Sequence, residues 1–340
     1  MTFKDNSIEC VNFQNHVEGV SVEVCNIMTR LGYGEEMRRR RIKKYSDHDM
    51  NMSERPGSMI PITVGSKGEG LTFNLESDRD FLCVLKHVLC VEAGVVLHTI
   101  PDDIEVYRMD TRVYPGHCIM LLERPASTRT DVIYYALCDD GKGNAVLSSA
   151  VLLHELSKLE FSEGLSAERA GLSIPRTIIG GGKIDMVLAV RCQCPDILQR
   201  WAQRSRLWPP PDIVQKVVSF GSFFVPTGFK GSDTRNLEWR ICFNTGEKEL
   251  VNNLYVTLTK LYTILKMILK EVLKPNNKEI TSFVLKNVIF WQAENNVPSI
   301  FHERNLIHWL HDTLGTLRTV IACTQLPYYT IPERNLMAAC

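Results

Sequence analysis

A glycine–serine turn followed by two alternating aspartates is the part of this sequence whose residue types could do chemistry. The segment 65–70 begins with Gly65 and Ser66, and Asp78 and Asp80 come directly before an apolar run. Glycines let backbone N–H groups approach a phosphate, and the serine adds a hydroxyl. Residues i and i+2 of a strand face the same side, so the two aspartates would point together. Two carboxylates on one face suit Mg²⁺, which takes oxygen ligands.

A third acid, Asp185, stands near the start of another apolar run, after the glycines at 180–182. A buried charge is costly unless it is paired or bound to a metal. Two-metal phosphoryl transfer needs carboxylates from neighbouring strands. The three aspartates therefore predict a site for two ions, Mg²⁺ or Mn²⁺, beside a triphosphate. The alternatives are an Asp-x-Asp pair that is only solvated and an Asp185 that caps a strand at a turn.

The elements that must hold these residues follow from the spacing of apolar positions. Segment 7–31 has apolar residues at steps of three and four, which predicts a long helix interrupted by Gly32 and Gly34. The polar stretch from Ser46 to Pro61 predicts a mobile connector. Strands are predicted at 60–64, 80–90, 93–99, 117–123, 131–137 and from 183. Helices are predicted over 150–156, from 212, over 249–273 and on to about 322.

This order predicts an α+β protein, in which a mixed β-sheet follows a long N-terminal spine helix and a helical lobe closes the chain. We divide it into a spine helix and connector at 1–60, a core at 61–205 and a C-terminal helical lobe at 206–340. The last two would form one catalytic unit. Such layering leaves a cleft between lobes where a ligand can sit.

Composition limits the class of protein. The chain has 340 residues, 44% of them hydrophobic, and no net charge, so any nucleic-acid surface must be a local patch. No apolar run is long enough to span a membrane, and the N-terminus lacks the features of a signal peptide. Eleven cysteines without regular spacing then indicate reduced thiols. We expect a cytoplasmic protein with no membrane partner.

Other residue groups give weaker indications. Cys192 and Cys194 form one close cysteine pair, which without a second pair is better read as structural than as a zinc site. The histidines His302, His308 and His311 are better read as ordinary helix residues, so no zinc is expected. Trp208, Trp239 and Trp291 are assigned to core packing. One dense basic run stands out, and its default interpretation is a solvated helical face, whereas the sharper one is contact with a nucleic-acid backbone: Arg38, Arg39, Arg40, Arg41, Lys43 and Lys44.

The chain resembles the animal male-abnormal-twenty-one (Mab-21) family, and within it the cyclic GMP-AMP synthase-like receptors, whose nucleotidyltransferase fold is shared distantly with DNA polymerase beta. The resemblance covers nearly the whole chain and implies a bilobed nucleotidyltransferase core. It is carried by these segments: Gly65-Ser66 with Glu69-Gly70-Leu71, Ser77-Asp78-x-Asp80, Asp185 ahead of Val190-Arg191-Cys192, Arg204-x-Arg206-x-Trp208-Pro209, 237–243, 247–250, Ser282-Phe283-x-x-Lys286, and 329–336.

The resemblance assigns roles to particular residues. It makes Asp78, Asp80 and Asp185 the metal triad, which is also the catalytic triad. It implies that Gly65 and Ser66 hold nucleotide phosphates. The remaining nucleotide-binding residues it implies are Arg240 and Glu247 toward base and ribose, Ser282 and Phe283 at a base-stacking position, and Lys266, or less surely Lys260, at a phosphate.

The implied activity is synthesis of a cyclic dinucleotide second messenger from two nucleoside triphosphates, such as ATP and GTP, in innate immune sensing. The family's DNA sensor carries a His-Cys zinc insertion that this chain lacks between Leu250 and Tyr262. Double-stranded RNA is therefore favoured over DNA as the activator, bound where the basic run falls. Two alternatives remain open: a catalytically silent scaffold or nucleotide-binding protein, and a template-independent polymerase that adds linear tails.

Overall fold

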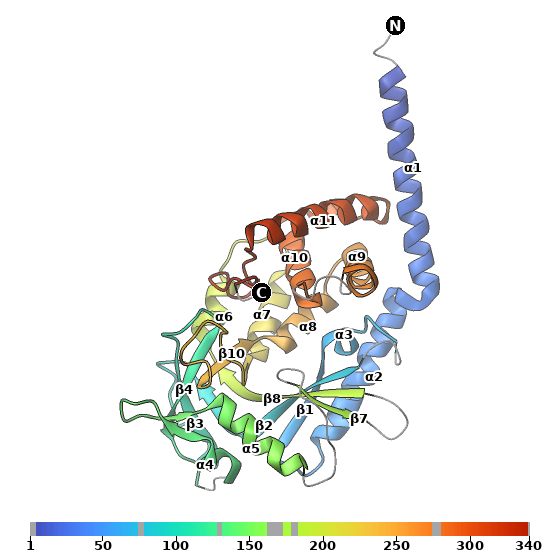
Figure 1. Cartoon of the computed structure of the whole chain (residues 1–340). Helices are drawn as coiled ribbons and strands as arrows, with labels where there is room; N and C mark the ends of the chain where they lie inside the picture. The colour runs from blue at the N-terminus through green and yellow to red at the C-terminus, as the bar shows by residue number, and fades with distance from the viewer. Residues whose placement is uncertain are drawn as a thin grey trace.

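The computed structural model describes residues 5–73, 78–127, 131–161, 173–177, 183–273 and 280–338. Within these ranges, side chains are described from residue 14 onward, except at 159–161, 174–177 and 273. The architecture is the α+β arrangement predicted from the sequence, with a mixed sheet and a lobe of helices stacked above it (Figure 1).

The chain begins with a long helix broken once. Helix α1 (Asp5–Met28) projects beyond the body, and α2 (Glu35–Ser53) follows after a kinked turn, η1 (Thr29–Tyr33) (Figure 1). Gly32 makes the break, because its φ of +87° lies in the left-handed region that favours glycine. The interruption was predicted, but the connector from Ser46 was wrong because α2 continues to Ser53.

Ten strands among the described residues form one sheet: β1 (Met59–Val64), β2 (Arg79–Val91), β3 (Glu105–Asp110), β4 (His117–Arg124), β5 (Leu137–Asp139), β6 (Ala145–Leu147), β7 (Ile174–Thr177), β8 (Lys183–Gln193), β9 (Ser222–Val225) and β10 (Glu238–Cys242). The pairings run β2-β3-β4-β10-β9-β8, and β8 pairs again with β2, so these strands form a closed ring. Strands β2 and β8 are parallel, and their ends lie beneath the helical lobe.

Three details of the sheet differ from the prediction. Segment 93–99 is not a strand, since it turns at Gly94, whose φ is +89°. Segment 131–137 begins as a short helix, α4 (Asp131–Tyr135), which buries Ile133 in the core. Strand β3 was not predicted. Its buried residues pack between β2 and β4, a position that local sequence does not reveal.

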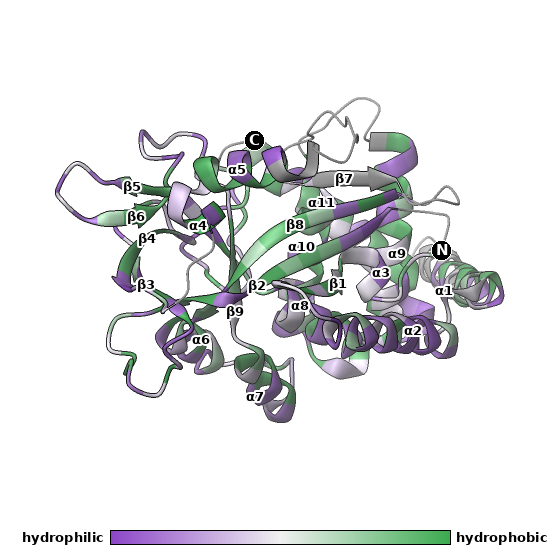
Figure 2. Cartoon of the chain, turned by 90° about the horizontal axis from the view of Figure 1, so that it is seen from below, coloured by the Kyte–Doolittle hydropathy of each residue, from purple (hydrophilic) through white to green (hydrophobic). Residues whose placement is uncertain are grey.

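The remaining helices are α3 (Gly65–Gly68), α5 (Ser149–Phe161), α6 (Pro195–Ala202), α7 (Pro211–Phe220), α8 (Asn244–Asn252), α9 (Val256–Ile268) with the π turn η2 (Leu269–Leu273), α10 (Ser282–Asn295), the 3-10 turns η3 (Pro298–Ile300) and η4 (Glu303–Asn305), and α11 (Leu306–Cys323). The predicted helix 249–273 is thus divided between α8 and α9, because the chain turns at Asn253. Seen from below, α5 lies on one side of the sheet and α2, α7 and α8 on the other (Figure 2).

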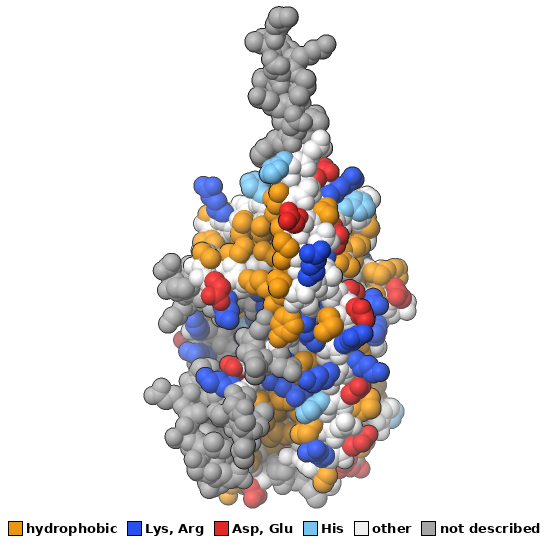
Figure 3. Space-filling model, turned by 90° about the vertical axis from the view of Figure 1, so that its right-hand side faces the viewer, with side chains coloured by type: hydrophobic (Ala, Val, Ile, Leu, Met, Phe, Trp, Pro, Cys, Tyr) orange, Lys and Arg blue, Asp and Glu red, His pale blue; other side chains and the backbone are white. Residues whose placement is uncertain are grey.

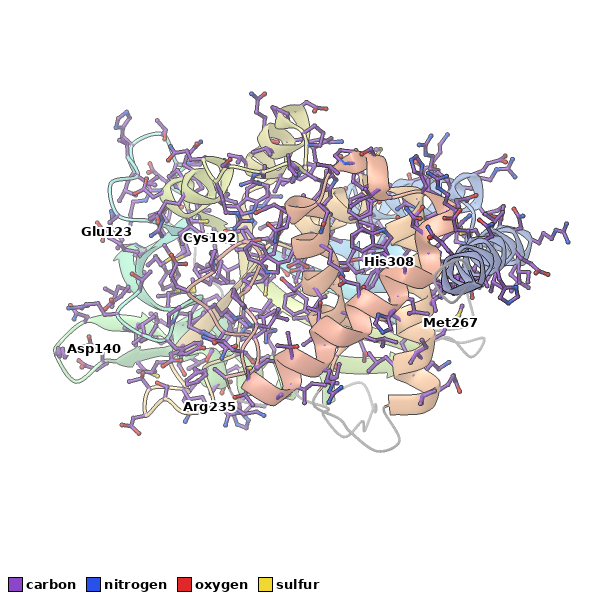
Figure 4. The ribbon with its side chains drawn as sticks, turned by 90° about the horizontal axis from the view of Figure 1, so that it is seen from above. Glu123, Asp140, Cys192, Arg235, Met267 and His308 are labelled. Atoms are coloured by element: carbon purple, nitrogen blue, oxygen red, sulfur yellow. The ribbon has the colours of Figure 1, made fainter. Side chains whose placement is uncertain are left out.

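The two largest of four hydrophobic clusters in the described chain stabilise the two lobes. One joins α7 to α11 and contains Trp208, and the other lies against the sheet and contains Trp239. Both tryptophans are almost fully buried, and Trp291 packs at the edge of the first core, as their assignment to packing predicted. The labelled Met267 and Cys192 mark the helical and the sheet side of the molecule (Figure 4). Across the described residues, no helix combines the length and apolar character needed to span a membrane.

Candidate active site

The sheet brings two of the predicted acids face to face. Strands β2 and β8 run in parallel, and Asp80 is the register partner of Asp185. Paired residues on neighbouring strands point to the same side of the sheet. Asp78 lies just before β2 and is exposed. All three aspartates line one cleft of about 460 Å³ between the sheet and the helical lobe.

The charge around Asp80 shows how close the acids are. Burial, and then the negative charges of Asp185, Asp78 and Glu69, raise the pKa of Asp80 to about 6, while Lys266 opposes the rise. Within the part of the chain that the structure describes, none of the three aspartates forms an ion pair. The cleft therefore holds an excess of negative charge, because its lining has more carboxylates than lysines.

The carboxylates of the cleft are ligands of the type that a divalent cation binds. Carboxylate oxygens are the ligands that Mg²⁺ takes, and clustered like charges of this sign favour a cation. However, over the described residues no three His, Cys, Asp or Glu side chains already form a compact group around one ion. An ion would have to draw the three carboxylates together.

The Gly-Ser turn lies against the acids. Gly65 has a φ of +62°, which favours glycine, and a Cβ at this position would stand 2.5 Å from Oδ2 of Asp80, so a larger residue would push that carboxylate aside. Ser66 lines the cleft, and its hydroxyl accepts a hydrogen bond from Nζ of Lys266 on α9. The turn, the acids and one lysine therefore meet in the cleft although they come from separate segments.

The two lysines on α9 have different positions. Lys266 lines the cleft, whereas Lys260 is buried and forms an ion pair of 2.6 Å with Glu303 of η4. The two residues are six positions apart, so they face different sides of the helix. The geometry thus favours Lys266 as the residue that can meet a phosphate.

Of the residues predicted to approach a base, Ser282 lines the cleft, whereas Phe283 and Arg240 do not. Ser282 begins α10 and lines the cleft. Phe283 is half-buried, does not line the described cleft, and lies 5.6 Å from the ring centroid of Tyr328. Arg240 on β10 is also half-buried and outside that cleft.

Glu247 is held in a buried network instead of facing the cleft. Its two carboxylate oxygens accept from Nζ of Lys286 at 3.2 Å and from the hydroxyl of Tyr328 at 2.7 Å. Lys286 also pairs with Glu69 at 2.5 Å, and all three charged residues are buried. Burial alone would lower the pKa of Lys286, but Glu69 and Glu247 together raise it. Both oxygens of Glu247 are thus engaged with buried side chains, and Glu247 does not line the described cleft.

The basic run on α2 divides into an inner and an outer face. Arg38 is buried, pairs with Glu35 and donates to the backbone oxygen of Asn252, and Arg41 donates to the backbone oxygens of Gly32 and Gly70. The expectation that Arg38 contacts a nucleic acid was therefore wrong, because Arg38 is buried and holds α2 against the body. The contact predicted for Arg41, which is half-buried, stays a prediction.

The outer face of α2 carries the rest of the run: Arg39, Arg40, Lys43 and Lys44 are exposed. Two of these residues form ion pairs one turn back, Arg39 with Glu35 and Arg40 with Glu36. Basic and acidic side chains are accordingly interspersed over the face that carries α1 and α2 (Figure 3).

Some cleft residues were missed from the sequence. Tyr33 reaches the cleft from the break between α1 and α2, and Lys270 and Glu271 reach it from the turn after α9. Lys270 lies four positions after Lys266, a spacing that could have pointed to it. Ser77 and the glycines at 180–182, which the sequence analysis singled out, lie outside the described residues.

Two family models match adjoining parts of the chain. The Mab-21 protein nucleotidyltransferase domain matches residues 177–253, and the Mab-21 protein HhH/H2TH-like domain matches residues 257–340. The first match includes Asp185 but not Asp78 or Asp80, and the boundary between the two falls between α8 and α9. No curated protein matches the chain.

Proposed function

The chain belongs to the Mab-21 family and carries its nucleotidyltransferase domain, and from this premise we propose that it joins two nucleoside triphosphates into a cyclic dinucleotide. The observation that carries the proposal is the register of β2 and β8, which sets Asp80 opposite Asp185 in the cleft that also holds the Gly-Ser turn. A lone solvated Asp-x-Asp pair would not need a third acid on the neighbouring strand.

The Gly-Ser turn, Lys266 and the three aspartates each have a role in this proposal. The N–H groups of the Gly65–Gly68 turn, the Ser66 hydroxyl and Lys266 would hold the triphosphate. Asp78, Asp80 and Asp185 would hold two Mg²⁺ or Mn²⁺ ions, which when bound activate the attacking ribose hydroxyl and neutralise charge on the departing pyrophosphate. Nζ of Lys266 donates to the Ser66 hydroxyl. An incoming phosphate would accept from the same ammonium group, which already points into the cleft.

The activator in this proposal is a double-stranded nucleic acid, with RNA favoured, bound on the outer face of α2. The inner arginines offer a route from that face to the cleft. Arg41 donates to the backbone oxygen of Gly70, and Arg38 lies within 3.5 Å of the backbone oxygen of Glu69. Both acceptors directly follow the Gly-Ser turn. A shift of α2 on binding would therefore move the turn.

The proposal is tested by supplying substrates and activators together. Purified protein is incubated with ATP, GTP, UTP, CTP and Mn²⁺ and a panel of double-stranded RNAs and DNAs, and products are identified by mass spectrometry. We expect a cyclic dinucleotide with RNA, and its loss in the Asp78→Ala and Asp80→Ala variants. If no member of the panel gives a product that depends on these aspartates, the proposal fails.

The alternative of a silent scaffold has one observation in its favour. The described acids do not yet form a compact metal group, as would suit a protein that binds a nucleotide without catalysis. Calorimetry separates the two, because a scaffold would bind ATP equally with and without Mn²⁺. Linear products of many sizes on a gel would instead indicate a tailing polymerase.

A further inference from the structure

Helix α1 packs on the body of the molecule with one side only. Ser21, Cys25 and Met28 are buried, at steps of four and three residues that place them on one side of a helix. The hydroxyl of Ser21 accepts a hydrogen bond from the backbone N–H of Ile307 on α11. Nearer its start, the helix projects beyond the body (Figure 1), and Gln14 is exposed. The side of α1 away from the buried residues is left uncovered by the part of the chain that the structure describes.

A stripe of apolar side chains follows this uncovered part of the helix. Val20, Ile27 and Leu31 are 36%, 46% and 58% exposed. Steps of seven and four residues place them in one line along the helix. The sequence continues the same spacing back to Phe13, seven positions before Val20. Apolar side chains gather on this side of the molecule (Figure 3). A stripe with this spacing is typical of a helix that packs against another helix.

The charge of α1 does not suit a nucleic acid. The sequence of the helix contains four acidic residues and no lysine or arginine. The outer face of α2, in contrast, carries the exposed side chains of Arg39, Arg40, Lys43 and Lys44. Basic side chains attract a phosphate backbone, so a nucleic acid would favour α2 over α1. The apolar stripe of α1 is therefore left for another kind of partner.

The charges beside the stripe are complementary to themselves. Glu23 and Arg30 are exposed, lie seven positions apart, and form no ion pair within the described part of the chain. In an antiparallel pair of identical helices the same edge of each helix meets. Glu23 would then lie opposite Arg30 of the partner subunit, and Arg30 opposite the partner's Glu23. A two-fold axis near Ile27 produces both contacts at once, so a second copy of this chain fits the stripe.

The opposite charges of α1 and α2 agree with the same arrangement. An antiparallel partner helix runs past the end of α1, where α2 begins after the break at Gly32. The acidic start of that partner helix would therefore extend toward the basic outer face of α2. Exposed opposite charges attract each other most at low ionic strength, so the association should weaken as salt is added.

We propose that this chain forms an antiparallel homodimer in which α1 packs against α1 of the partner subunit. Val20, Ile27 and Leu31 would supply the apolar centre of the interface, and the two Glu23–Arg30 pairs its charged rim. A two-fold interface of this kind uses the same surface on both subunits, so it closes and leaves no free stripe. The inference goes beyond the proposed function and does not depend on it.

The short stripe predicts a reversible dimer. From Val20 to Leu31 it is about 16 Å long, so the interface lies at the small end of those in stable complexes. Sedimentation velocity of the full chain across micromolar concentrations should show a monomer–dimer equilibrium. Ile27→Glu should raise the Kd of the dimer by at least about tenfold, because a carboxylate would be buried against the partner helix. Val22→Glu is the matched control: Val22 is 38% exposed but lies on a different side of α1, so the Kd should not change.

Charge reversal tests the antiparallel arrangement. Glu23→Lys places like charges opposite each other at both rim contacts, and Arg30→Glu does the same. Each variant should therefore raise the Kd by a few fold at low salt. The double variant restores opposite charges, so its Kd should return to the wild-type value. Thermal unfolding verifies that each variant is folded.

The inference is overturned if the chain stays monomeric at these concentrations, or if Val22→Glu and Ile27→Glu weaken the dimer equally. Association that appears only after double-stranded RNA is added would assign this side of the molecule to nucleic acid and would also overturn it. If neither single charge reversal changes the Kd at low salt, or if the double variant dissociates more readily than either, the antiparallel arrangement fails.

Discussion

Two groups of carboxylates lie near the Gly-Ser turn, and they differ in what surrounds them. Asp78, Asp80 and Asp185 face one another without an ion pair in the described chain. Glu69 and Glu247 share the ammonium of Lys286 and are buried with it. Both groups bring like charges together, but only in the second does a cation form ion pairs with the acids, whereas Lys266 near the aspartates forms none with them in the described chain.

The comparison shows which of the two groups can serve a ligand. A group whose charges and hydrogen bonds are satisfied within the fold has little to offer an incoming molecule, and removing one partner leaves a buried charge behind. A group left unbalanced can gain from a counter-ion. By this criterion the aspartates belong to the site, and the Glu69–Lys286–Glu247 network supports the wall beside it.

The largest effect is expected from Asp185→Asn. If the aspartates act on a bound ion, the variant should lose product formation by roughly a thousandfold, about 4 kcal/mol. Because it also removes a like charge facing Asp80, the metal-free protein should unfold no more easily than the wild type in urea. Asp233→Asn, at an exposed position, is the control for activity. A variant that was active, or clearly destabilised, would place Asp185 with the structural acids.

Lys286→Met should instead lower the stability of the protein. It leaves Glu69 and Glu247 buried without their cation, so the free energy of unfolding in urea should fall by about 3–5 kcal/mol. Lys216→Met breaks the more exposed pair with Glu249 and should cost at most about 1 kcal/mol. Equal losses in the two variants would show that the buried network is not the support we describe.

The buried ring of His117 predicts a pH dependence of stability. His117 has a pKa of about 4 in the fold and about 6.5 when unfolded. The unfolded chain therefore binds more protons between these values, and stability should fall as pH drops from 6.5 toward 4. At pH 5 the His117 contribution lost is about 2 kcal/mol. Between pH 7 and 5, the free energy of unfolding in urea should change less with pH in His117→Gln than in the wild type. Parallel curves would contradict the buried neutral ring, whose charged neighbours are Arg334, Arg240 and Glu238.

The smallest expected effect is the difference in stability between Gly65→Ala and Gly141→Ala, which separates backbone strain from contact with Asp80. Gly65 and Gly141 both have positive φ, but only at Gly65 would a Cβ meet another residue, Asp80. Alanine at either position costs about 1–2 kcal/mol for the left-handed backbone. Gly65→Ala should cost about 1 kcal/mol more in urea unfolding, because Asp80 must move by a fraction of an ångström. An equal loss of unfolding free energy in the two alanine variants would show that Gly65 does not closely approach Asp80.

Much of the fold could be predicted because long elements carry strong periodicity. The spine helix, strands β1, β2, β4 and β8 and the helices after Pro211 lie near their predicted places. Short elements could not be predicted, since β3 and α4 are determined by what packs on them. Segment 93–99 has the residue types of a strand, but the chain turns there at Gly94.

The sequence by itself determined which residues are available: three aspartates, a turn where glycine is required and a basic run on one helix. Only the tertiary structure decided which of them meet. Strand register set Asp80 opposite Asp185, helix rotation turned Lys266 to the cleft and Lys260 away, and packing buried Arg38 while leaving Arg39 exposed. The physical reason is that charge compensation depends on distances between segments far apart in the chain, which local spacing does not encode.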